Sequence, residues 1–285
     1  MTTLYERAYA KVNLTLDVLG KRTDGYHDLC SVMQTISLCD EITIRMGTGK
    51  DWVLSCSKDG IPTDSRNLAW KAAKVFLDAA GKDPNGIEIH INKNIPSEAG
   101  LGGGSADAAA VLRALNNHYN QPFSIQELAS LGAAVGSDVP FCTVGGTAMV
   151  EGRGEHVRSL PDMPKCAFVV CKPDFSASTP ALYRKLDEIE IADRPDNVTI
   201  EQAISRGDLN QVAASLCNVF EPAVGMDYPE LYHIKDRFSS LGAMAQLMSG
   251  SGSSVFALVK DMGEATEIYR ALEPEYPNLY IAEPV

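Results

Sequence analysis

The stretch Pro96–Asn116, PSEAGLGGGSADAAAVLRALN, constrains the fold more than any other part of the sequence. Its glycines lie between a strand-like segment and a run with apolar residues at helical spacing. Glycine adopts positive φ and carries no Cβ, so backbone N–H groups can converge there on an anion. The following helix adds unpaired N–H groups and the positive end of its dipole. The stretch is typical of a phosphate cradle or, on glycine content alone, of a structural hinge.

Two common phosphate loops are excluded by the same residues. The stretch lacks the G-K-S/T ending of a Walker A loop. It also breaks the third glycine of the G-x-G-x-x-G fingerprint, and the segment HYNQPFS offers no acidic residue near position 120. The chain is therefore neither a P-loop protein nor a dinucleotide-binding protein of the Rossmann type.

Hydrophobic periodicity predicts an α+β protein in two lobes. Strict alternation in residues 11–19 indicates a half-buried strand, with Lys11 and Asn13 on its polar face. Further strands are expected at 31–38, 41–46, 51–56, 87–91, 143–152, 167–171, 255–259 and 279–284, and helices at 67–81, 105–119, 125–136, 180–186, 209–220, 229–242 and 263–273. The charged, proline-containing segment 153–165 is the candidate boundary between domains 1–158 and 159–285.

The net charge of −12 argues against a nucleic-acid partner, which usually meets a basic surface. No apolar run approaches the length of a membrane span, and the N-terminal residues do not resemble a signal peptide. The seven cysteines form no C-x-x-C pair, which suits reduced thiols rather than a disulfide framework or a metal site. We expect a cytoplasmic protein without a membrane partner.

Several polar residues stand out from these elements. Lys11 and Asn13 share one strand face, and Asp138 in GSDVPF follows a helix, where an Asp is otherwise typical of a cap or turn. A second glycine- and serine-rich loop, SGSGSS at 249–254, precedes a strand and favours either a tight turn or a phosphate site shared with the first loop. Phosphoryl transfer needs a residue that orients or deprotonates a hydroxyl, and a cation nearby.

Aromatic residues follow the Asp24–Gly25 turn signal and the start of a later helix. Tyr26 and His27 come directly after the turn, where they would either bind a planar ligand or pack under the loop. Thr179 is expected to cap the helix that begins at Pro180, which places Tyr183 close to its first turn.

Three segments together resemble the GHMP kinase superfamily: AKVNLTLDVLGKRTDGYHDL, PSEAGLGGGSADAA and MSGSGSSVFAL. They occur in the family's order, and the similarity extends over essentially the whole chain. The resemblance implies an N-terminal lobe like ribosomal protein S5 domain 2 and a ferredoxin-like C-terminal lobe. Within this family, three motifs are similar to those of members that phosphorylate the 2-hydroxyl of a cytidine diphosphate-linked methylerythritol (CDP-methylerythritol). These motifs are the first segment, the triple glycine and GSDVPF.

The resemblance also assigns roles. Asp138 would accept the proton of the acceptor hydroxyl, and Lys11 would make that hydroxyl more acidic. Asn13, Tyr26, His27, Thr179 and Tyr183 would bind the substrate, with His27 reading the base edge and Tyr183 stacking on the base. ATP, accompanied by magnesium, would place its phosphates on Pro96, Ser97, Glu98, Ala99, Gly100, Leu101, Gly102, Gly103, Gly104, Ser105 and Ala106, with Asn67 and Lys93 on the adenine side.

The sequence departs from the family pattern at Ala106, where a second serine is frequent, so Ser105 supplies the side-chain hydroxyl at this helix start. Two other interpretations stay open: a GHMP kinase for another small alcohol, such as homoserine or mevalonate, and a non-catalytic nucleotide-binding module on the same fold. The partners expected are ATP and a small molecule, with the chain a monomer or weak homodimer. We expect no resident metal site.

Overall fold

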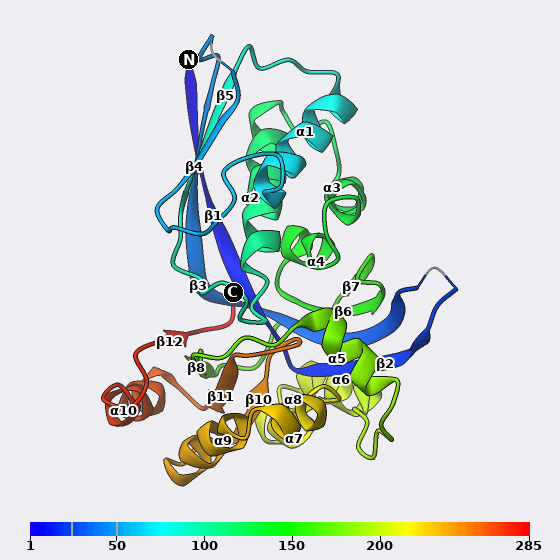
Figure 1. Ribbon diagram of the computed structural model, residues 1–285, viewed down its shortest axis with the longest axis vertical. Coiled ribbons are helices and arrows are strands. Elements are labelled where there is room, and N and C mark those ends of the chain that lie inside the picture. Colours follow the sequence, from blue (N-terminus) through cyan, green and yellow to red (C-terminus); the bar gives the residue numbers. More distant parts are fainter. Residues whose placement is uncertain (24, 50) are drawn as a thin grey trace.

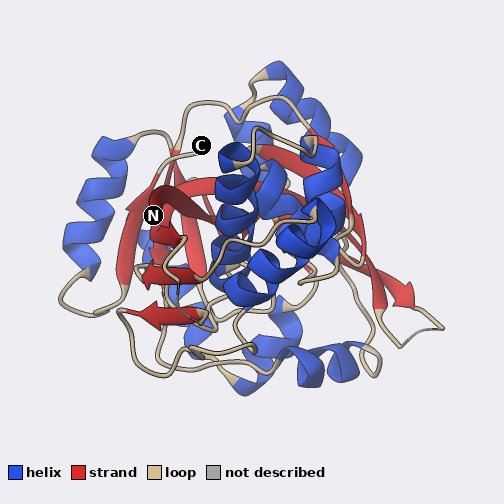
Figure 2. Ribbon diagram, turned by 90° about the horizontal axis from the view of Figure 1, so that it is seen from above, coloured by secondary structure: helices blue, strands red, loops and turns tan. Residues whose placement is uncertain are grey.

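The computed structural model describes residues 1–23, 25–49 and 51–285, so Asp24 of the expected turn lies outside the described residues. Figure 1 shows two lobes, an upper one with helices α1–α4 beside a long sheet and a lower one with helices packed beneath a smaller sheet. The hairpin of strands β2 and β3 projects from the body in this view and in the view from above (Figure 2). Among the described residues, no helix combines the length and the apolar composition needed to span a membrane.

The elements of the upper lobe come mainly from the first half of the chain. Its strands are β1 Thr2–Asn13, β2 Thr15–Lys21, β3 His27–Met46, β4 Val53–Cys56, β5 Ile87–Asn92, β6 Thr147–Gly152 and β7 His156–Ser159, and its helices are α1 Leu68–Ala80, α2 Gly103–His118, α3 Ile125–Ala133 and α4 Val139–Val144. The lower lobe contains strands β8 Ala167–Cys171, β9 Cys217–Asn218, β10 Ala245–Met248, β11 Val255–Val259 and β12 Leu279–Ala282, and helices α5 Thr179–Leu186, α6 Asn197–Arg206, α7 Leu209–Ala214, α8 Glu221–Asp227, α9 Glu230–Ser240 and α10 Met262–Leu272.

Strand β3 organises the upper sheet because it is long enough to pair with four others. The whole of β1 pairs antiparallel with residues 33–46 of β3. Strand β5 pairs with the C-terminal end of β3, and β2 and β6 pair with its N-terminal end. Helix α2 lies against β1 and α1, and ten of its sixteen residues are buried, among them all of its alanines. The glycine stretch therefore leads into a helix that is packed into the hydrophobic core of the upper lobe.

The four strands of the lower sheet are antiparallel and lie in the order β10-β11-β8-β12. In chain order the lobe reads strand, helices, strand, strand, helix, strand, which is the ferredoxin-like arrangement. This agrees with the expected C-terminal lobe and with the predicted α+β class.

Strand pairing is one of the ways in which the lobes are joined. Strand β2 pairs in parallel with β9, with Thr15 opposite Cys217, and the C-terminal residues return to the upper lobe through a bridge from Pro284 to Ile36. The predicted division after residue 158 falls inside β7, which pairs with β6, and that division stays a prediction.

The structure corrects several of the expected elements. The polar residues of segment 11–17 are buried rather than exposed, because they face the junction of the lobes instead of solvent. The strands expected at 31–38 and 41–46 form one continuous strand, β3. No helix was expected directly after Asp138, but Val139–Val144 form helix α4, and the strand expected at 143–152 begins at Thr147. Strands β1, β7 and β10 and helices α6 and α8 were also missed by periodicity. The helix expected at 209–220 is wrong beyond Ala214, where α7 ends, because Cys217–Asn218 pair with β2 as strand β9.

Candidate active site

The two glycine-rich loops meet at the junction of the lobes. Gly100 has φ +73°, and a Cβ at this position would lie 2.0 Å from the carbonyl oxygen of Ser249. The Ser249 hydroxyl donates to the Gly100 carbonyl at 2.9 Å, and the backbone N–H of Ser254 donates to the Ala99 carbonyl at 3.1 Å. The loops thus form one structure, as expected for a shared site, and a side chain at Gly100 would separate them.

The first loop leads directly into helix α2. Gly102 precedes the helix at φ +69°, and no side chain caps the first turn. The N–H groups of that turn therefore lack side-chain partners, and with the helix dipole they form an electropositive end suited to an anion.

Lys11 lies beneath this loop at the inner end of β1. Its backbone N–H donates to the Leu101 carbonyl at 3.0 Å, and its ammonium donates to Oδ1 of Asn13 at 2.6 Å. The Lys11 side chain is 4% exposed, and its Nζ lies 3.6 Å from Oδ2 of Asp138. Because a β-bulge shifts the pairing of β1 with β3 between Tyr9 and Lys11, the strand changes course just before these residues.

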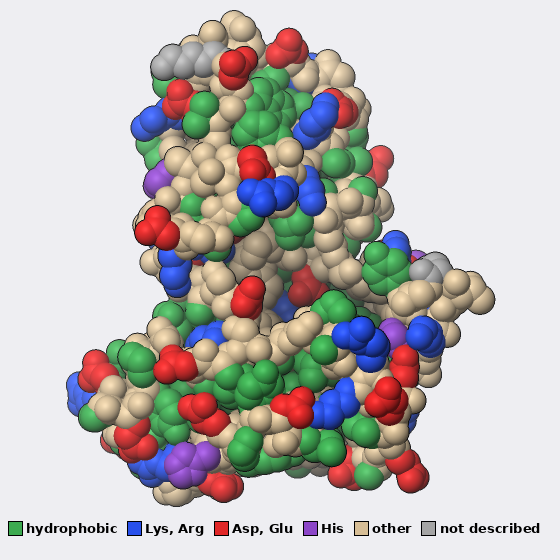
Figure 3. Space-filling model, in the orientation of Figure 1, with side chains coloured by type: hydrophobic (Ala, Val, Ile, Leu, Met, Phe, Trp, Pro, Cys, Tyr) green, Lys and Arg blue, Asp and Glu red, His purple; other side chains and the backbone are tan. Residues whose placement is uncertain are grey.

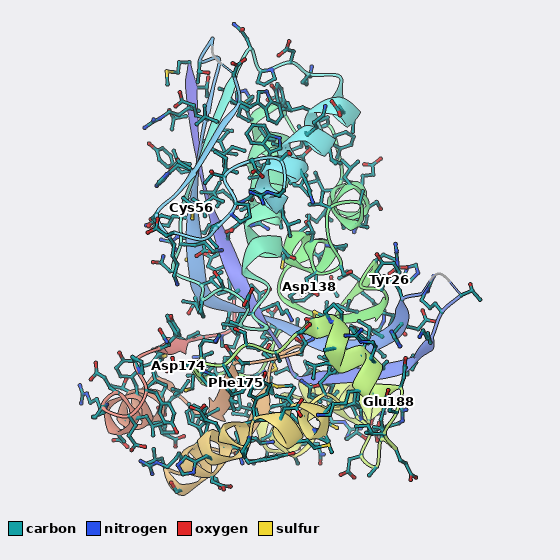
Figure 4. All side chains as sticks on the ribbon, in the orientation of Figure 1. Tyr26, Cys56, Asp138, Asp174, Phe175 and Glu188 are labelled. Atoms are coloured by element: carbon teal, nitrogen blue, oxygen red, sulfur yellow. The ribbon has the colours of Figure 1, made fainter. Side chains whose placement is uncertain are left out.

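Asp138 occupies the N-cap position of α4, yet its side chain makes no capping hydrogen bond. Pro140 in the first turn lacks an N–H group, which reduces the need for a cap. The Asp138 carboxylate is 33% exposed, so it reaches both Lys11 and the open space of the junction. Figure 4 places Asp138 where the upper lobe meets the lower one. Asp138 thus stands at the cap position that the simple interpretation predicts, but its carboxylate makes no capping hydrogen bond and lines the pocket.

An aromatic cluster lies further along the junction. The rings of His27 and Tyr183 stack with centroids 4.6 Å apart, and Phe220 packs edge-on against Tyr183 at 5.0 Å. Burial, together with the charge of Asp138, raises the pKa of Tyr183 to about 12. Tyr26 is half-exposed, and the Arg153 guanidinium lies 4.9 Å from its ring centroid. This end of the site is aromatic and suits a planar group.

Two adjoining pockets connect these groups. One, of about 760 Å³, is lined by the glycine loop and by Asn67, Lys93 and residues 176–180. The other, of about 720 Å³, contains Lys11, Asn13, Asp138 and the aromatic cluster. Both are lined by Gly100, Gly102, Ser105, Thr179 and Ser251, so the glycine loop separates two ligand-sized spaces. The space-filling view shows the molecule hollowed between its lobes (Figure 3).

Comparison with known proteins agrees with this arrangement. Residues 67–146 match the family model of the GHMP kinases N terminal domain, and residues 200–278 match that of the GHMP kinases C terminal. The chain belongs to the GHMP kinases. A 4-diphosphocytidyl-2-C-methyl-D-erythritol kinase of Caldicellulosiruptor saccharolyticus is 43% identical over 91% of this chain and 89% of that protein.

Other relatives cover this GHMP kinase almost completely. The kinase of the same name from Clostridium botulinum (strain Langeland) is 42% identical over 99% of this chain and 100% of that protein. A crystal structure of 4-(cytidine 5'-diphospho)-2C-methyl-D-erythritol kinase superimposes with a TM-score of 0.81 at 33% identity, covering 98% of each chain. The two-lobed GHMP kinase fold expected from the sequence is thereby confirmed.

Within this GHMP kinase, Lys93 lies in a buried charge cluster. Its ammonium donates to Oδ2 of Asp107 at 2.7 Å and to Asp40, whose other oxygen accepts from the backbone N–H groups of Asn94 and Ile95. Burial lowers the pKa of Lys93, but the charges of Asp107 and Asp40 outweigh burial and leave it above the usual value. Lys93 lines the pocket of about 760 Å³ with its ammonium already paired.

Asn67 and Thr179 also have structural partners. The Asn67 side chain caps α1 by accepting from the Ala69 N–H at 2.9 Å, and it donates to the Pro62 carbonyl at 2.7 Å. The sequence predicted Thr179 as the N-cap of α5, but Ser178 occupies that position. The Thr179 hydroxyl instead lies 2.7 Å from the hydroxyl of Ser251. Periodicity places a helix start only to within a residue or two.

Sequence reasoning missed several residues that this site contains. Ser31 accepts a hydrogen bond from the Asn13 amide at 2.8 Å, and Asp187 lies 3.0 Å from His27. Arg153 could have been noticed, because glycines on both sides of it indicate a tight turn; both have positive φ in the structure. No sequence pattern indicated Asp40 and Asp107 as partners of Lys93, because only the tertiary fold brings the three residues together.

Proposed function

We propose that this GHMP kinase transfers the γ-phosphoryl group of ATP to the 2-hydroxyl of CDP-methylerythritol, giving the 2-phosphate and ADP in non-mevalonate isoprenoid precursor synthesis. One observation carries the proposal: the uncapped Asp138 carboxylate lies beside the buried Lys11 ammonium, where two pockets share the glycine loop. The curated relatives with this activity, which match nearly the whole chain, support the same reaction.

The two pockets receive the two substrates. The ATP phosphates would lie against the backbone N–H groups of residues 100–105 and the start of α2, with the adenine toward Asn67. The cytidine would lie among the aromatic residues of the second pocket, which places the erythritol chain between the cytidine and Asp138. The acceptor hydroxyl and the γ-phosphate then meet at the loop that separates the pockets.

Asp138 acts as the base in this arrangement. As the hydroxyl oxygen forms its bond to the γ-phosphorus, Asp138 takes the hydroxyl proton, and the bond from that phosphorus to the ADP oxygen breaks. Lys11 stabilises the negative charge that develops on the attacking oxygen, and Asn13 holds the Lys11 ammonium in place at 2.6 Å. The reaction needs no covalent intermediate with the protein.

Magnesium enters this scheme as part of the ATP substrate. The described residues contain no group of three His, Cys, Asp or Glu side chains placed to hold a metal ion. Mg²⁺ usually keeps several waters and binds through substrate phosphates, so this donor set fits a magnesium–nucleotide complex. The cytoplasmic location and the monomeric or weakly dimeric state expected from the sequence remain predictions.

Release of ADP tests the proposal. Purified protein is incubated with ATP, magnesium and CDP-methylerythritol, and in parallel with homoserine and with mevalonate. We expect ADP only with the cytidine substrate, together with a 2-phosphate product in phosphorus NMR. Preference for an acceptor without cytidine would favour another GHMP activity, and no ADP with any acceptor would favour a non-catalytic nucleotide-binding module.

A further inference from the structure

The ring of His27 is held on its face and on its edge by the same helix. Tyr183 and Asp187 are four residues apart at the end of α5, so their side chains project from the same side. Tyr183 stacks on the imidazole with an interplanar angle of 20°, while Oδ1 of Asp187 lies 3.0 Å from Nε2. The His27 side chain is 8% exposed, so the ring has little freedom to turn.

Asp187 also contacts both strands of the projecting hairpin, at the place where β2 ends and β3 begins. Lys21 and His27 are directly opposite each other in the pairing of β2 with β3. Oδ2 of Asp187 lies 3.4 Å from the Lys21 ammonium, while Oδ1 binds His27. The hydrogen bond from His27, supported by the charge of Lys21, lowers the pKa of Asp187. The side chain is therefore a carboxylate at neutral pH, and it can only accept hydrogen bonds.

This geometry determines which ring nitrogen carries the proton. A carboxylate at Nε2 requires Nε2–H, which leaves Nδ1 as the acceptor of the neutral imidazole. No hydrogen bond joins Nδ1 to any of the residues that the structure describes. We propose that Asp187 is a positioning residue that fixes the Nε2–H form of His27 and thereby makes Nδ1 the acceptor that reads the substrate's base. The inference rests on the proposed function.

The chemistry of pyrimidines gives this arrangement a consequence for specificity. Cytosine carries an amino group at position 4, which donates hydrogen bonds, whereas uracil carries a carbonyl oxygen there, which accepts them. An acceptor nitrogen facing that position matches cytosine and opposes uracil. Fixing the protonated nitrogen of His27 at Nε2 therefore favours a cytidine-linked substrate over the uridine-linked analogue.

The first experiment observes the imidazole directly. Nitrogen-15 NMR spectra of the free enzyme identify the His27 signals by their loss in His27→Gln. We expect the Nε2–H form in the wild type and in Asp187→Glu, and a mixture of both neutral forms in Asp187→Ala. An Nδ1–H form in the wild type, or an unchanged spectrum in Asp187→Ala, overturns the proposal.

The second experiment measures kinetics with CDP-methylerythritol and with its uridine analogue. In Asp187→Ala we expect the KM for the cytidine substrate to rise about tenfold, which is the loss of roughly one hydrogen bond. The kcat and the KM for ATP should stay near wild type, and the preference for cytidine over uridine should fall. Asp227→Asn is the matched control, because it removes the 2.7 Å ion pair of Lys185, on the same helix, without touching His27.

The outcomes separate this inference from the proposed function. Equal KM values and equal base preference in Asp187→Ala and wild type overturn the role of Asp187 while the kinase activity stands. If wild-type enzyme releases no ADP with the cytidine substrate, the proposed function fails, and the NMR experiment still decides whether Asp187 sets the protonated nitrogen of His27.

Discussion

The ammonium of Lys11 lies 3.6 Å from Oδ2 of Asp138, and the two groups differ sharply in exposure. The Lys11 side chain is almost completely buried, while a third of the Asp138 side chain is open to the pocket. A fixed buried cation beside an accessible carboxylate differs from an ordinary surface ion pair, which contributes little and is screened by water. It suits a base that must reach a substrate hydroxyl.

Replacing Asp138 by Asn should abolish most of the activity without unfolding the protein. The amide cannot accept the hydroxyl proton, and loss of a general base typically lowers kcat by about 10²- to 10⁴-fold. Because Asp138 makes no capping hydrogen bond and the amide oxygen of Asn can still face the Lys11 ammonium, the midpoint of thermal unfolding should change little. Turnover is measured by ADP release, with Asp236→Asn on the exposed face of α9 as control. Near-normal turnover by Asp138→Asn would remove Asp138 as the base.

Replacing Lys11 by Met tests the cation separately from the base. The methionine keeps the apolar stem but removes the ammonium, which leaves Oδ1 of Asn13 without its 2.6 Å partner. We expect kcat to fall by about 10²-fold, since stabilisation of charge in the transition state is lost, and the affinity for ATP to change much less. Calorimetry with an ATP analogue measures the affinity. A large loss of ATP binding with normal kcat would place Lys11 on the nucleotide instead.

The residues around the first glycine-rich loop could largely be predicted, because they occur in short sequence patterns. The glycines of the first loop and the lysine on a strand occur in short segments whose geometry follows from the sequence. The burial of Lys11, Asn13 and Asp17 could not be predicted. Alternation shows that two faces differ, but the lower lobe, which covers the polar face, comes from residues more than a hundred positions later.

Helix α4, which begins directly after Asp138, was missed for a related reason. Helix α4 has six residues, too few for a periodic pattern, and Pro140 in its first turn looks like a helix breaker in the sequence. The partners of Lys93 were missed because Asp40 and Asp107 lie on separate elements. Local pattern thus predicted which residues matter at the loop, while long-range packing decided what each side chain touches.

Replacing Gly100 by Ala should separate the two glycine-rich loops. The added Cβ would lie 2.0 Å from a backbone oxygen of Ser249, which cannot move aside as a flexible side chain would, and φ +73° is strained for alanine. We expect a lower midpoint of thermal unfolding and a loss of ATP binding, both measured on purified protein. Gly20→Ala is the control, since no atom lies within 4 Å of a Cβ there. Normal ATP affinity in Gly100→Ala would contradict the shared site.

The buried cluster around Lys93 should make stability depend on pH through Asp107. Oδ1 of Asp107 has no hydrogen-bond partner in the part of the chain that the structure describes, and burial raises the pKa of Asp107 to about 7 even though Lys93 opposes the shift. In the unfolded chain the pKa is about 4. Between these values the folded state binds the proton more tightly, so ionisation of Asp107 lowers the free energy of unfolding as pH rises from about 4 to about 7.

Asp107→Asn should remove this part of the pH dependence, because the amide can still accept the hydrogen bond of Lys93 but cannot ionise. Urea unfolding of wild type and variant at several pH values from 5 to 8 measures the difference between the two free energies. We expect Asp107→Asn to gain stability relative to wild type as pH rises, with Asp236→Asn showing no such trend. Lys93→Met should instead lose about 3–5 kcal/mol at pH 8, because it leaves two buried carboxylates unpaired. A constant difference between Asp107→Asn and wild type across this range would show that Asp107 does not titrate there.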